Sequence, residues 1–274
     1  MSKPRTFSKH SREYWKISLL PYLLFLAIPI LGLFWRNDWS NFSINLRNPL
    51  ILQAVLLSLK TSLISVLVTI LLGTPVAYYL SHRKYRFHRL LDTLVDLPTM
   101  LPPAVAGLAL LMAFGRRGLV GAWLSPLGIE LPFTEAAVIM AQTFVAAPLY
   151  IKAAAIGFTD VDCELRKAAA LDGANRWNVF RHIILPISRT ALISGAALTW
   201  ARALGEFGAT LIFAGNFPGR TQTMPLAIYI GFEINLTQAL TLSVIMIVVS
   251  ATILAVVKGV LHWQVNQLAE EEWD

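Results

Sequence analysis

Apolar residues gather along this chain in long blocks separated by short polar segments. A helix that spans a membrane needs about 20 apolar residues, and six blocks come close to that length or exceed it. The blocks are residues 17–35, 52–80, 92–114, 134–156, 190–213 and 238–260. The pattern predicts an all-α fold, a polytopic bundle of about six transmembrane helices over residues 17–260. Two short tails, 1–16 and 261–274, flank it.

One polar segment, residues 161–187, stands out between the fourth and fifth blocks. The apolar positions of its first part recur at the i, i+3, i+4 spacing of one helical face: Leu165, Ala168 and Ala169. This spacing predicts a short amphipathic helix over about residues 161–171. Gly173 follows at the place where a left-handed C-cap favours glycine, because glycine has no Cβ to clash there.

A second short helix is predicted in the rest of this segment. Trp177, Phe180 and Ile184 fall on one helical face at i, i+3 and i+7. The helix is expected to end near Leu185–Pro186, because proline cannot continue the hydrogen-bond ladder. Two short helices joined at a glycine outside the bilayer indicate a docking surface for a soluble partner. The alternative is a solvated loop, residues 157–189, that only connects two membrane helices.

Composition and charge strengthen the membrane assignment and set an orientation. Of 274 residues, 56% are hydrophobic and 14% are charged, against roughly 25% charged in soluble domains. Segments 1–16, 81–91, 157–189 and 261–274 carry fourteen Lys and Arg residues, and segments 36–51, 115–133 and 214–237 carry five. By the positive-inside rule the first group, with both termini, faces the cytoplasm. The basic stretch 81–89 is expected to contact anionic lipid head groups.

Several classes of function are disfavoured by what the sequence lacks. A single cysteine, Cys163, leaves no disulfide framework and no multi-cysteine metal site. The net charge of +7 comes without a basic, aromatic-rich patch for nucleic acid. No G-x-x-x-x-G-K-[ST] motif occurs, so any ATP hydrolysis must reside on a separate chain. No H-E-x-x-H motif and no nucleophile–base pair on one span supports a membrane-embedded enzyme.

The first block follows a basic N-terminus, as the apolar core of a secretory signal does. The block 17–35 is longer than such a core, and no small-residue cleavage site follows it. We therefore expect an uncleaved first span.

Prolines interrupt the third block, LPTMLPPAVAG. A helix that restarts at Pro102–Pro103 has about 13 residues before Phe114 ends it, or ~20 Å at ~1.5 Å per residue, short of the ~30 Å hydrocarbon core. Broken backbone at that depth must be satisfied by protein or by a water-filled cavity. Residues 97–107 are therefore expected to line a pathway near its gate, and a proline kink buried in helix packing is the alternative. The candidate pathway residues here are Pro98, Thr99, Pro102 and Pro103.

The fifth block carries two charges. Arg202 and Glu206 lie four residues apart and can pair, and either charge alone at mid-membrane would cost at least ~2.5–3.5 kcal/mol. The pair is either a neutralised structural ion pair or a functional one, in which Arg202 supplies positive potential along an anion pathway. Small residues at i+4 spacing allow another helix to approach closely: Ala197, Ala201, Gly205 and Ala209. In the second block, Lys60 is either functional or snorkels to the nearer membrane face.

The segment 161–187 resembles the cytoplasmic loop of ABC importer permeases, which has the form E-A-A-x-x-x-G, nine residues, then I-x-L-P. Lys167 stands where that family has glutamate, and Glu164 one turn earlier is a candidate substitute. The positions that match the motif at its spacing are Ala168, Ala169, Gly173, Ile183, Leu185 and Pro186. The resemblance implies contacts with a cytoplasmic ATPase subunit through Glu164, Lys167, Ala168, Ala169, Asp172, Gly173, Arg176, Ile183, Leu185 and Pro186.

Residues 97–111 and 201–229 resemble molybdate importer permeases, and the resemblance covers about residues 50–260. It implies a permease subunit of the bacterial inner membrane, with two copies forming the pathway. An external or periplasmic binding protein would deliver molybdate, or alternatively tungstate or sulfate. ATP is expected on the ATPase subunit, and no cofactor or metal on this chain. An ion-coupled secondary transporter is the remaining alternative, with three ionisable candidates inside spans: Lys60, Arg202 and Glu206.

Overall fold

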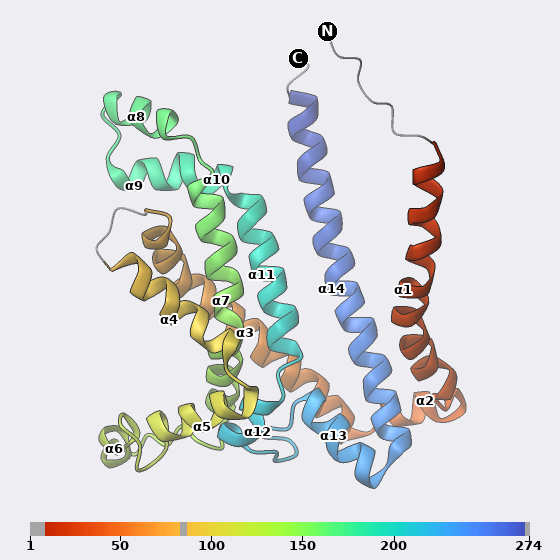
Figure 1. Ribbon diagram of the computed structural model, residues 1–274. Helices are drawn as coiled ribbons and strands as arrows, with labels where there is room; N and C mark the ends of the chain where they lie inside the picture. The colour runs from red at the N-terminus through yellow and green to blue at the C-terminus, as the bar shows by residue number, and fades with distance from the viewer. Residues whose placement is uncertain (1–8, 83–86, 272–274) are drawn as a thin grey trace.

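The computed structural model describes residues 9–82 and 87–271, with side chains described for 19–82 and 87–259. All regular secondary structure in this part of the chain is helical (Figure 1), which confirms the predicted all-α class. In chain order the helices are α1 (Lys9–Arg36), α2 (Trp39–Leu46), α3 (Pro49–Leu80), α4 (His88–Met100), α5 (Pro103–Phe114), α6 (Gly121–Leu124), η1 (Ser125–Leu127), α7 (Glu135–Thr159), α8 (Cys163–Leu171), α9 (Arg176–Val179), η2 (Phe180–Ile184), α10 (Leu185–Ile187), α11 (Arg189–Leu204), α12 (Gly208–Ala214), α13 (Met224–Ile234) and α14 (Leu236–Glu271).

Four of these helices are long and apolar enough to cross a membrane, namely α1, α3, α7 and α14. Two bent pairs, α4 with α5 and the α9–α10 segment with α11, raise the number of candidate spans to as many as six. That upper number agrees with the predicted bundle. Figure 1 shows α8 and α9 at the same end of the molecule as the start of α1 and the end of α14.

The helix of the third block is broken at the position that its prolines predict. α4 ends at Met100, α5 begins at Pro103, and the pair is bent by 116°. Proline suits this start because its missing N–H is one that a first helical turn leaves unpaired anyway. With 12 residues, α5 extends only about 18 Å at ~1.5 Å per residue. It is too short to cross the hydrocarbon core alone.

The fifth block departs from the prediction of one helix over residues 190–213. α11 ends at Leu204, and α12 begins only at Gly208. Glycine disfavours a helix interior by about 1 kcal/mol relative to alanine, and two glycines fall within four residues here. The expected stripe of small residues is therefore interrupted after Gly205. α12 continues the chain as a separate short helix.

Two further helices, α2 and α13, lie in segments expected to be connecting loops. Asp38 caps α2, where its carboxylate accepts the Ser40 and Asn41 backbone N–H groups. A side-chain hydrogen bond from Asn41 lowers the pKa of this carboxyl below its ordinary value. α13 has 11 residues, too few to span a membrane, and it packs against α14 and α3. The two predicted tails also contain helix, because α1 begins at Lys9 and α14 continues to Glu271.

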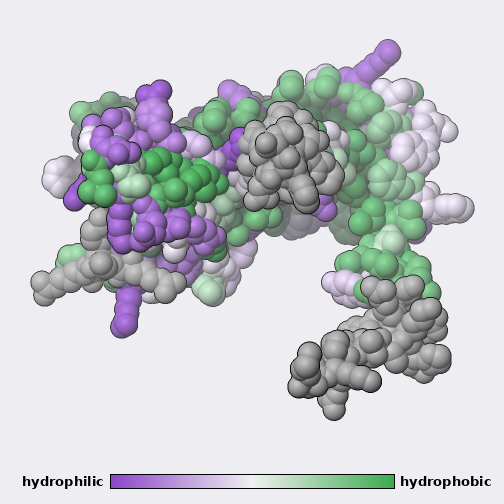
Figure 2. Space-filling model, turned by 90° about the horizontal axis from the view of Figure 1, so that it is seen from above, coloured by the Kyte–Doolittle hydropathy of each residue, from purple (hydrophilic) through white to green (hydrophobic). Residues whose placement is uncertain are grey.

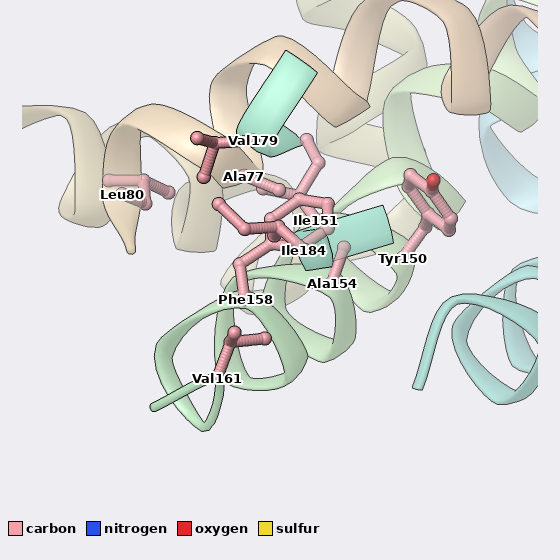
Figure 3. Close-up of a cluster of buried hydrophobic side chains, with 9 residues drawn as sticks. All are labelled: Ala77, Leu80, Tyr150, Ile151, Ala154, Phe158, Val161, Val179 and Ile184. Atoms are coloured by element: carbon pink, nitrogen blue, oxygen red, sulfur yellow. The ribbon is translucent and has the colours of Figure 1, made fainter. Parts of the chain in front are cut away.

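Three apolar clusters hold the bundle together. One joins the end of α3, the end of α7 and the helical hairpin formed by α8 to α10 (Figure 3). A second joins α5, α7 and α12. The third joins α3, α11, α13 and α14. Each cluster thus connects a long helix to one or more short or broken ones, which fixes the irregular backbone in place.

A buried polar stripe on α3 adds hydrogen bonds to these clusters: Ser58, Thr61, Ser62, Ser65 and Thr69. Ser58 Oγ accepts the first backbone N–H of α13 at 2.7 Å. Ser62 Oγ accepts the Trp200 indole N–H of α11 at 2.9 Å, and Ser65 Oγ donates to Gln142 Oε1 of α7 at 3.1 Å. Such bonds between membrane helices contribute roughly 0.6–2 kcal/mol each. Through these bonds α3 is joined to α7, α11 and α13, so it is the central helix of the fold.

Lys60 has a partner outside its own helix. Its Nζ lies 2.7 Å from Glu135 Oε1 at the start of α7, and the side chain of Lys60 is 61% exposed and that of Glu135 35% exposed in the single chain. Exposed pairs of this kind contribute little to stability. The pair favours the structural interpretation of Lys60 over a functional one.

Candidate functional site

The candidate site begins with the α8–α10 hairpin, whose first helix has defined caps at both ends. The Asp162 carboxylate accepts the Glu164 backbone N–H at 2.9 Å and starts α8. At the other end Gly173 has φ +86°, the left-handed conformation that the sequence predicted. Its N–H donates to Ala170 O at 3.2 Å, and the Ala174 N–H donates to Ala169 O at 3.0 Å. These two bonds form a Schellman motif, which fixes the direction in which the chain leaves α8.

The second half of the hairpin is longer than predicted. Asn175 caps α9 by accepting the Asn178 N–H at 2.8 Å. The helix then widens into a π-turn, η2, and continues through Pro186 to Ile187. A proline ring clashes with the carbonyl four residues earlier in an α-helix, and the wider turn just before Pro186 accommodates that ring. The helix therefore ends at Ile187, close to the predicted end near Leu185–Pro186, although Pro186 lies within it.

The outer face of α8 is exposed and mixed in character. Lys167 Nζ lies 3.3 Å from Glu164 Oε1, so the two charges form one exposed pair on the surface. Apolar side chains stand beside them, with Leu165 50% and Leu171 88% exposed. Large apolar side chains that project among charges at the tip of a molecule are typical of a protein–protein contact.

The inner face of the hairpin is anchored to the membrane helices. Figure 3 shows Val179 and Ile184 of the hairpin packed with Ala77 and Leu80 of α3 and with Phe158 of α7. Arg166 of α8 also connects the hairpin to the end of α7, because its guanidinium donates to the backbone carbonyls of Phe158 and Val161, the latter at 2.9 Å. The Ser188 hydroxyl donates to Gly157 O at 2.8 Å and ties the start of α11 to the end of α7. A force on α8 is therefore transmitted to α7 and α11.

The residues that match the loop motif divide into two groups in the structure. Ala169, Ile183 and Leu185 are half-buried, and the first two pack against the apolar cluster of Figure 3. They attach the hairpin to the bundle. The remaining predicted contact residues are exposed: Glu164, Lys167, Ala168, Asp172, Gly173, Arg176 and Pro186. Sequence reasoning grouped both sets as partner contacts, since a motif does not separate packing from exposure.

The second part of the site is formed by the two broken helices. The break between α4 and α5 lies against the break between α11 and α12: a Cβ on Gly208 would lie 2.7 Å from Pro103 Cβ, and one on Gly107 would lie 2.7 Å from Ala209 O. The segments predicted separately as a proline-rich gate and a charged span are therefore one structural unit. Thr99, Pro102 and Pro103 are exposed in the single chain and Pro98 is half-buried.

Arg202 and Glu206 pair as predicted, with Arg202 Nη1 2.7 Å from Glu206 Oε2. Glu206 does not lie in a helix, however, but in the break between α11 and α12. Its side chain is 1% exposed, whereas that of Arg202 is 36% exposed. The other carboxylate oxygen accepts the Ala209 N–H at 2.9 Å, at the start of α12. The carboxylate thus joins the two helices, and the guanidinium stands at the surface.

Sequence reasoning missed a charged cluster between α4 and α7. Lys152 Nζ lies 2.5 Å from Asp92 Oδ1 and 2.8 Å from Asp96 Oδ2. Lys152 falls inside the fourth predicted span, 134–156, whereas the ionisable candidates named from the sequence are Lys60, Arg202 and Glu206. The four-residue spacing of the two aspartates, which puts both on one face of α4, was the available signal. The cluster holds the inner part of α4, which has few other contacts, against α7.

The contact between the two breaks yields a test of the fold. Gly107→Ala is expected to destabilise the protein by about 1–3 kcal/mol, because the new methyl group meets backbone atoms of α12 that cannot rotate away. Gly32→Ala is the matched control, since nothing lies within 4 Å of a Cβ at that position in α1. We expect that control to be neutral or slightly stabilising. Thermal unfolding of both variants in detergent is the measurement, and equal melting temperatures would contradict the close packing.

Comparison with known proteins identifies the family that shares this sequence and this arrangement of helices. Residues 66–267 match the family described as "Binding-protein-dependent transport system inner membrane component". The chain is 39% identical over 231 residues to the molybdenum transport system permease protein ModB of Mycobacterium tuberculosis, covering 84% of this chain and 88% of that one. It is 37% identical over 238 residues to the probable transport system permease protein NifC of Clostridium pasteurianum, covering 86% and 83%. A probable sulfate transport permease of Nephroselmis olivacea is 31% identical, covering 90% and 88%.

Solved structures share the fold at lower identity. A chain of a bacterial ABC transporter that imports alginate superposes with a TM-score of 0.71 at 16% identity, covering 92% of this chain and 96% of that one. A chain of the methionine transporter MetNI in an inward-facing conformation superposes with a TM-score of 0.61 at 18% identity, covering 78% and 95%. This chain therefore belongs to the family of binding-protein-dependent transport system inner membrane components, as the permease subunit of an ABC importer whose ATP hydrolysis takes place on a separate subunit.

Proposed function

We propose that this permease imports molybdate. The observation that carries the proposal is its 39% identity to a molybdenum transport permease over 84% of this chain and 88% of that one. The 31% identity to a probable sulfate permease favours a related tetrahedral oxyanion as the second candidate. Molybdate and sulfate are both dianions, so a pathway for either gains from positive potential and from the absence of unpaired carboxylates.

The exposed face of α8 is proposed as the ATPase contact. Its charged pair and its exposed leucines, Leu165 and Leu171, offer both polar and apolar contacts to a cytoplasmic ATPase subunit. Gly173 sets the angle of this face, and Asp172 and Arg176 flank the turn. Because the hairpin is bonded to the ends of α7 and α11, closure of an ATPase pair would move these helices and not only the loop. Under this proposal the start of α1 and the end of α14, which lie at the same end of the molecule as the hairpin (Figure 1), face the cytoplasm.

The two helix breaks are proposed as the gate. Thr99, Pro102 and Pro103 are exposed in the single chain, and a second copy of the chain facing them would enclose a pathway between the two gates. Arg202, held by a buried carboxylate, would present its guanidinium on this surface and favour an anion. A periplasmic binding protein would release its oxyanion on the side opposite to the α8–α10 hairpin.

Uptake into reconstituted vesicles tests the proposal. The permease, its ATPase and its binding protein are placed in proteoliposomes, radiolabelled molybdate is supplied with the binding protein, and ATP is supplied on the ATPase side. We expect uptake that requires both ATP and the binding protein, and that excess tungstate reduces more strongly than excess sulfate does. Vesicles without the ATPase are the control.

Two outcomes would contradict the proposal. Uptake of labelled sulfate with unlabelled molybdate as a weak competitor would replace the proposed substrate with sulfate and leave the importer assignment intact. Uptake driven by a proton or sodium gradient in the absence of ATP would instead support a secondary transporter.

A further inference from the structure

A groove of about 930 Å³ lies between the inner half of α3 and the α8–α10 hairpin. Ile70, Leu71 and Pro75 of α3 line one part of it, and Tyr78 near the end of that helix and His82 just beyond it line the next part. The hairpin closes the groove from the other side. Figure 2, which looks down on this end of the molecule, shows an apolar surface between hydrophilic ones on the side where α8 and α9 lie.

The lining of the groove changes character along α3. Ile70 and Tyr78 are eight residues apart, or about 12 Å along the helix at ~1.5 Å per residue, and His82 lies just beyond the helix end. The apolar part includes Leu71 and lies beside Leu72, and these two side chains are 73% and 64% exposed. The polar part lies where α3 ends at Leu80 and the basic stretch 81–89 begins. Residues 83–86 of that stretch lie outside the described residues.

The hairpin contributes two positive charges to the groove, Arg166 and Arg176. Neither forms an ion pair with a carboxylate among the residues whose side chains the structure describes. Two Arg166 hydrogen bonds go to backbone carbonyls, which leave its charge uncompensated, and its buried Nε has no partner there. An aromatic wall stands beside these charges, with the Tyr78 and Phe180 rings 5.0 Å apart and the Trp177 and Phe180 rings 5.8 Å apart.

The groove combines an apolar surface along α3 with guanidinium groups that have no carboxylate partner among the described side chains. This combination is complementary to a molecule with an anionic head and an apolar chain. We propose that the groove binds an anionic phospholipid from the leaflet on the hairpin side, such as phosphatidylglycerol. Its phosphate would lie near Arg166 and Arg176, and an acyl chain would follow Ile70 and Leu71 toward the bilayer centre. The aromatic wall suits the boundary between head group and chain, where tyrosine and tryptophan concentrate.

The bound lipid would have a structural consequence for coupling. The groove separates α3, the central helix of the fold, from α9 and η2, which form most of the second half of the hairpin. A lipid in this space would brace the hairpin against α3. This inference does not depend on the identity of the transported oxyanion, so its failure and a failure of the proposed molybdate specificity are distinguishable.

Native mass spectrometry of the full-length permease in detergent tests lipid binding directly. We expect retention of phosphatidylglycerol over phosphatidylcholine at equal concentration. Arg176→Gln is expected to weaken phosphatidylglycerol binding about fivefold, the effect of one basic residue at an anionic surface. Arg181→Gln is the matched control, because it removes the same charge from an exposed position five residues away that does not line the groove. Equal retention of the two lipids, or equal losses in the two variants, would overturn the proposal.

Cross-linking identifies the occupant of the groove in the membrane. Ala170 lines the groove and is exposed, so Ala170→Cys in a Cys163→Ser background accepts a photoreactive label at one position. We expect adducts of lipid mass in vesicles that contain phosphatidylglycerol. Adducts with the ATPase or with a second copy of the permease would show that protein fills the groove, and would overturn the proposal. Because labelling does not require the Arg176 variant to fold, the test stands even if that variant is unstable.

Discussion

The Gly173→Val variant is expected to insert into the membrane normally but to bind its ATPase about five- to thirtyfold more weakly than the native chain. Gly173 has φ +86°, a conformation that costs a residue with a Cβ about 1–2 kcal/mol, and one or two kcal/mol corresponds to that range of equilibrium ratios. Valine would relieve the strain by opening the Schellman motif. The outer face of α8 would then lose its fixed angle to α9. Co-purification with the tagged ATPase at several concentrations measures the change.

The chain itself provides a matched control for this experiment. Gly128 also has a left-handed backbone, φ +75°, and as at Gly173 nothing lies within 4 Å of a Cβ built there. Gly128→Val therefore introduces comparable backbone strain in a loop far along the chain from the hairpin. We expect it to leave ATPase binding unchanged. Gly173→Asn should restore most of the binding, because asparagine tolerates the left-handed region, and unaltered co-purification of Gly173→Val would remove the docking proposal.

The hairpin and the proposed gate are joined by one helix, α11. α11 begins where the Ser188 hydroxyl bonds to the end of α7, and it ends next to the break that holds Glu206. Gly195, about midway along α11, permits close packing against α7, because a Cβ there would lie 2.8 Å from Ala153 Cβ on α7. α7 and α11 therefore form a closely packed pair with the proposed ATPase contact at one end and the broken helices at the other. Under the proposed function, a displacement of the hairpin would be transmitted along this pair to the proposed gate.

The sequence predicted the parts of this arrangement that depend on local chemistry. Six apolar blocks predicted the spans, the prolines at 102 and 103 predicted the break before α5, and Gly173 predicted the turn of the hairpin. Each of these follows from a rule that acts within one or two helical turns. The exposed α8 face also followed from the spacing of a few residues, although the burial of Ile183 and Leu185 did not.

Features that depend on contacts between distant segments were not predictable in this way. The break at residues 205–207 is stabilised by Glu206 at the start of α12 and by packing on α5, and the block alone looks like one helix. Lys152 looks like a single charge until Asp92 and Asp96 of another helix are placed beside it. α13 is too short to be recognised as a span, and its first N–H is bonded to Ser58 of α3. In each example a partner far along the chain decides the structure.

The charged pair at the proposed gate should respond differently to the loss of each partner. Arg202→Gln leaves the Glu206 carboxylate, 1% exposed, without its counter-charge. We expect this variant to lose about 3 kcal/mol of stability, as when one partner of a buried pair is removed. Glu206→Gln leaves the guanidinium of Arg202, which is 36% exposed and can turn toward solvent. The glutamine amide oxygen can still accept the Ala209 N–H, so we expect a loss of only about 1 kcal/mol.

A double-variant cycle separates stability from function at this pair. Arg202→Gln with Glu206→Gln removes both charges, and we expect its melting temperature in detergent to recover most of the loss seen in Arg202→Gln alone. Oxyanion uptake should not recover, because the double variant still lacks the positive charge at the proposed gate. Uptake that returns together with stability would show that the pair is only structural. Equal melting temperatures for the two single variants would contradict the asymmetric burial from which this prediction is derived.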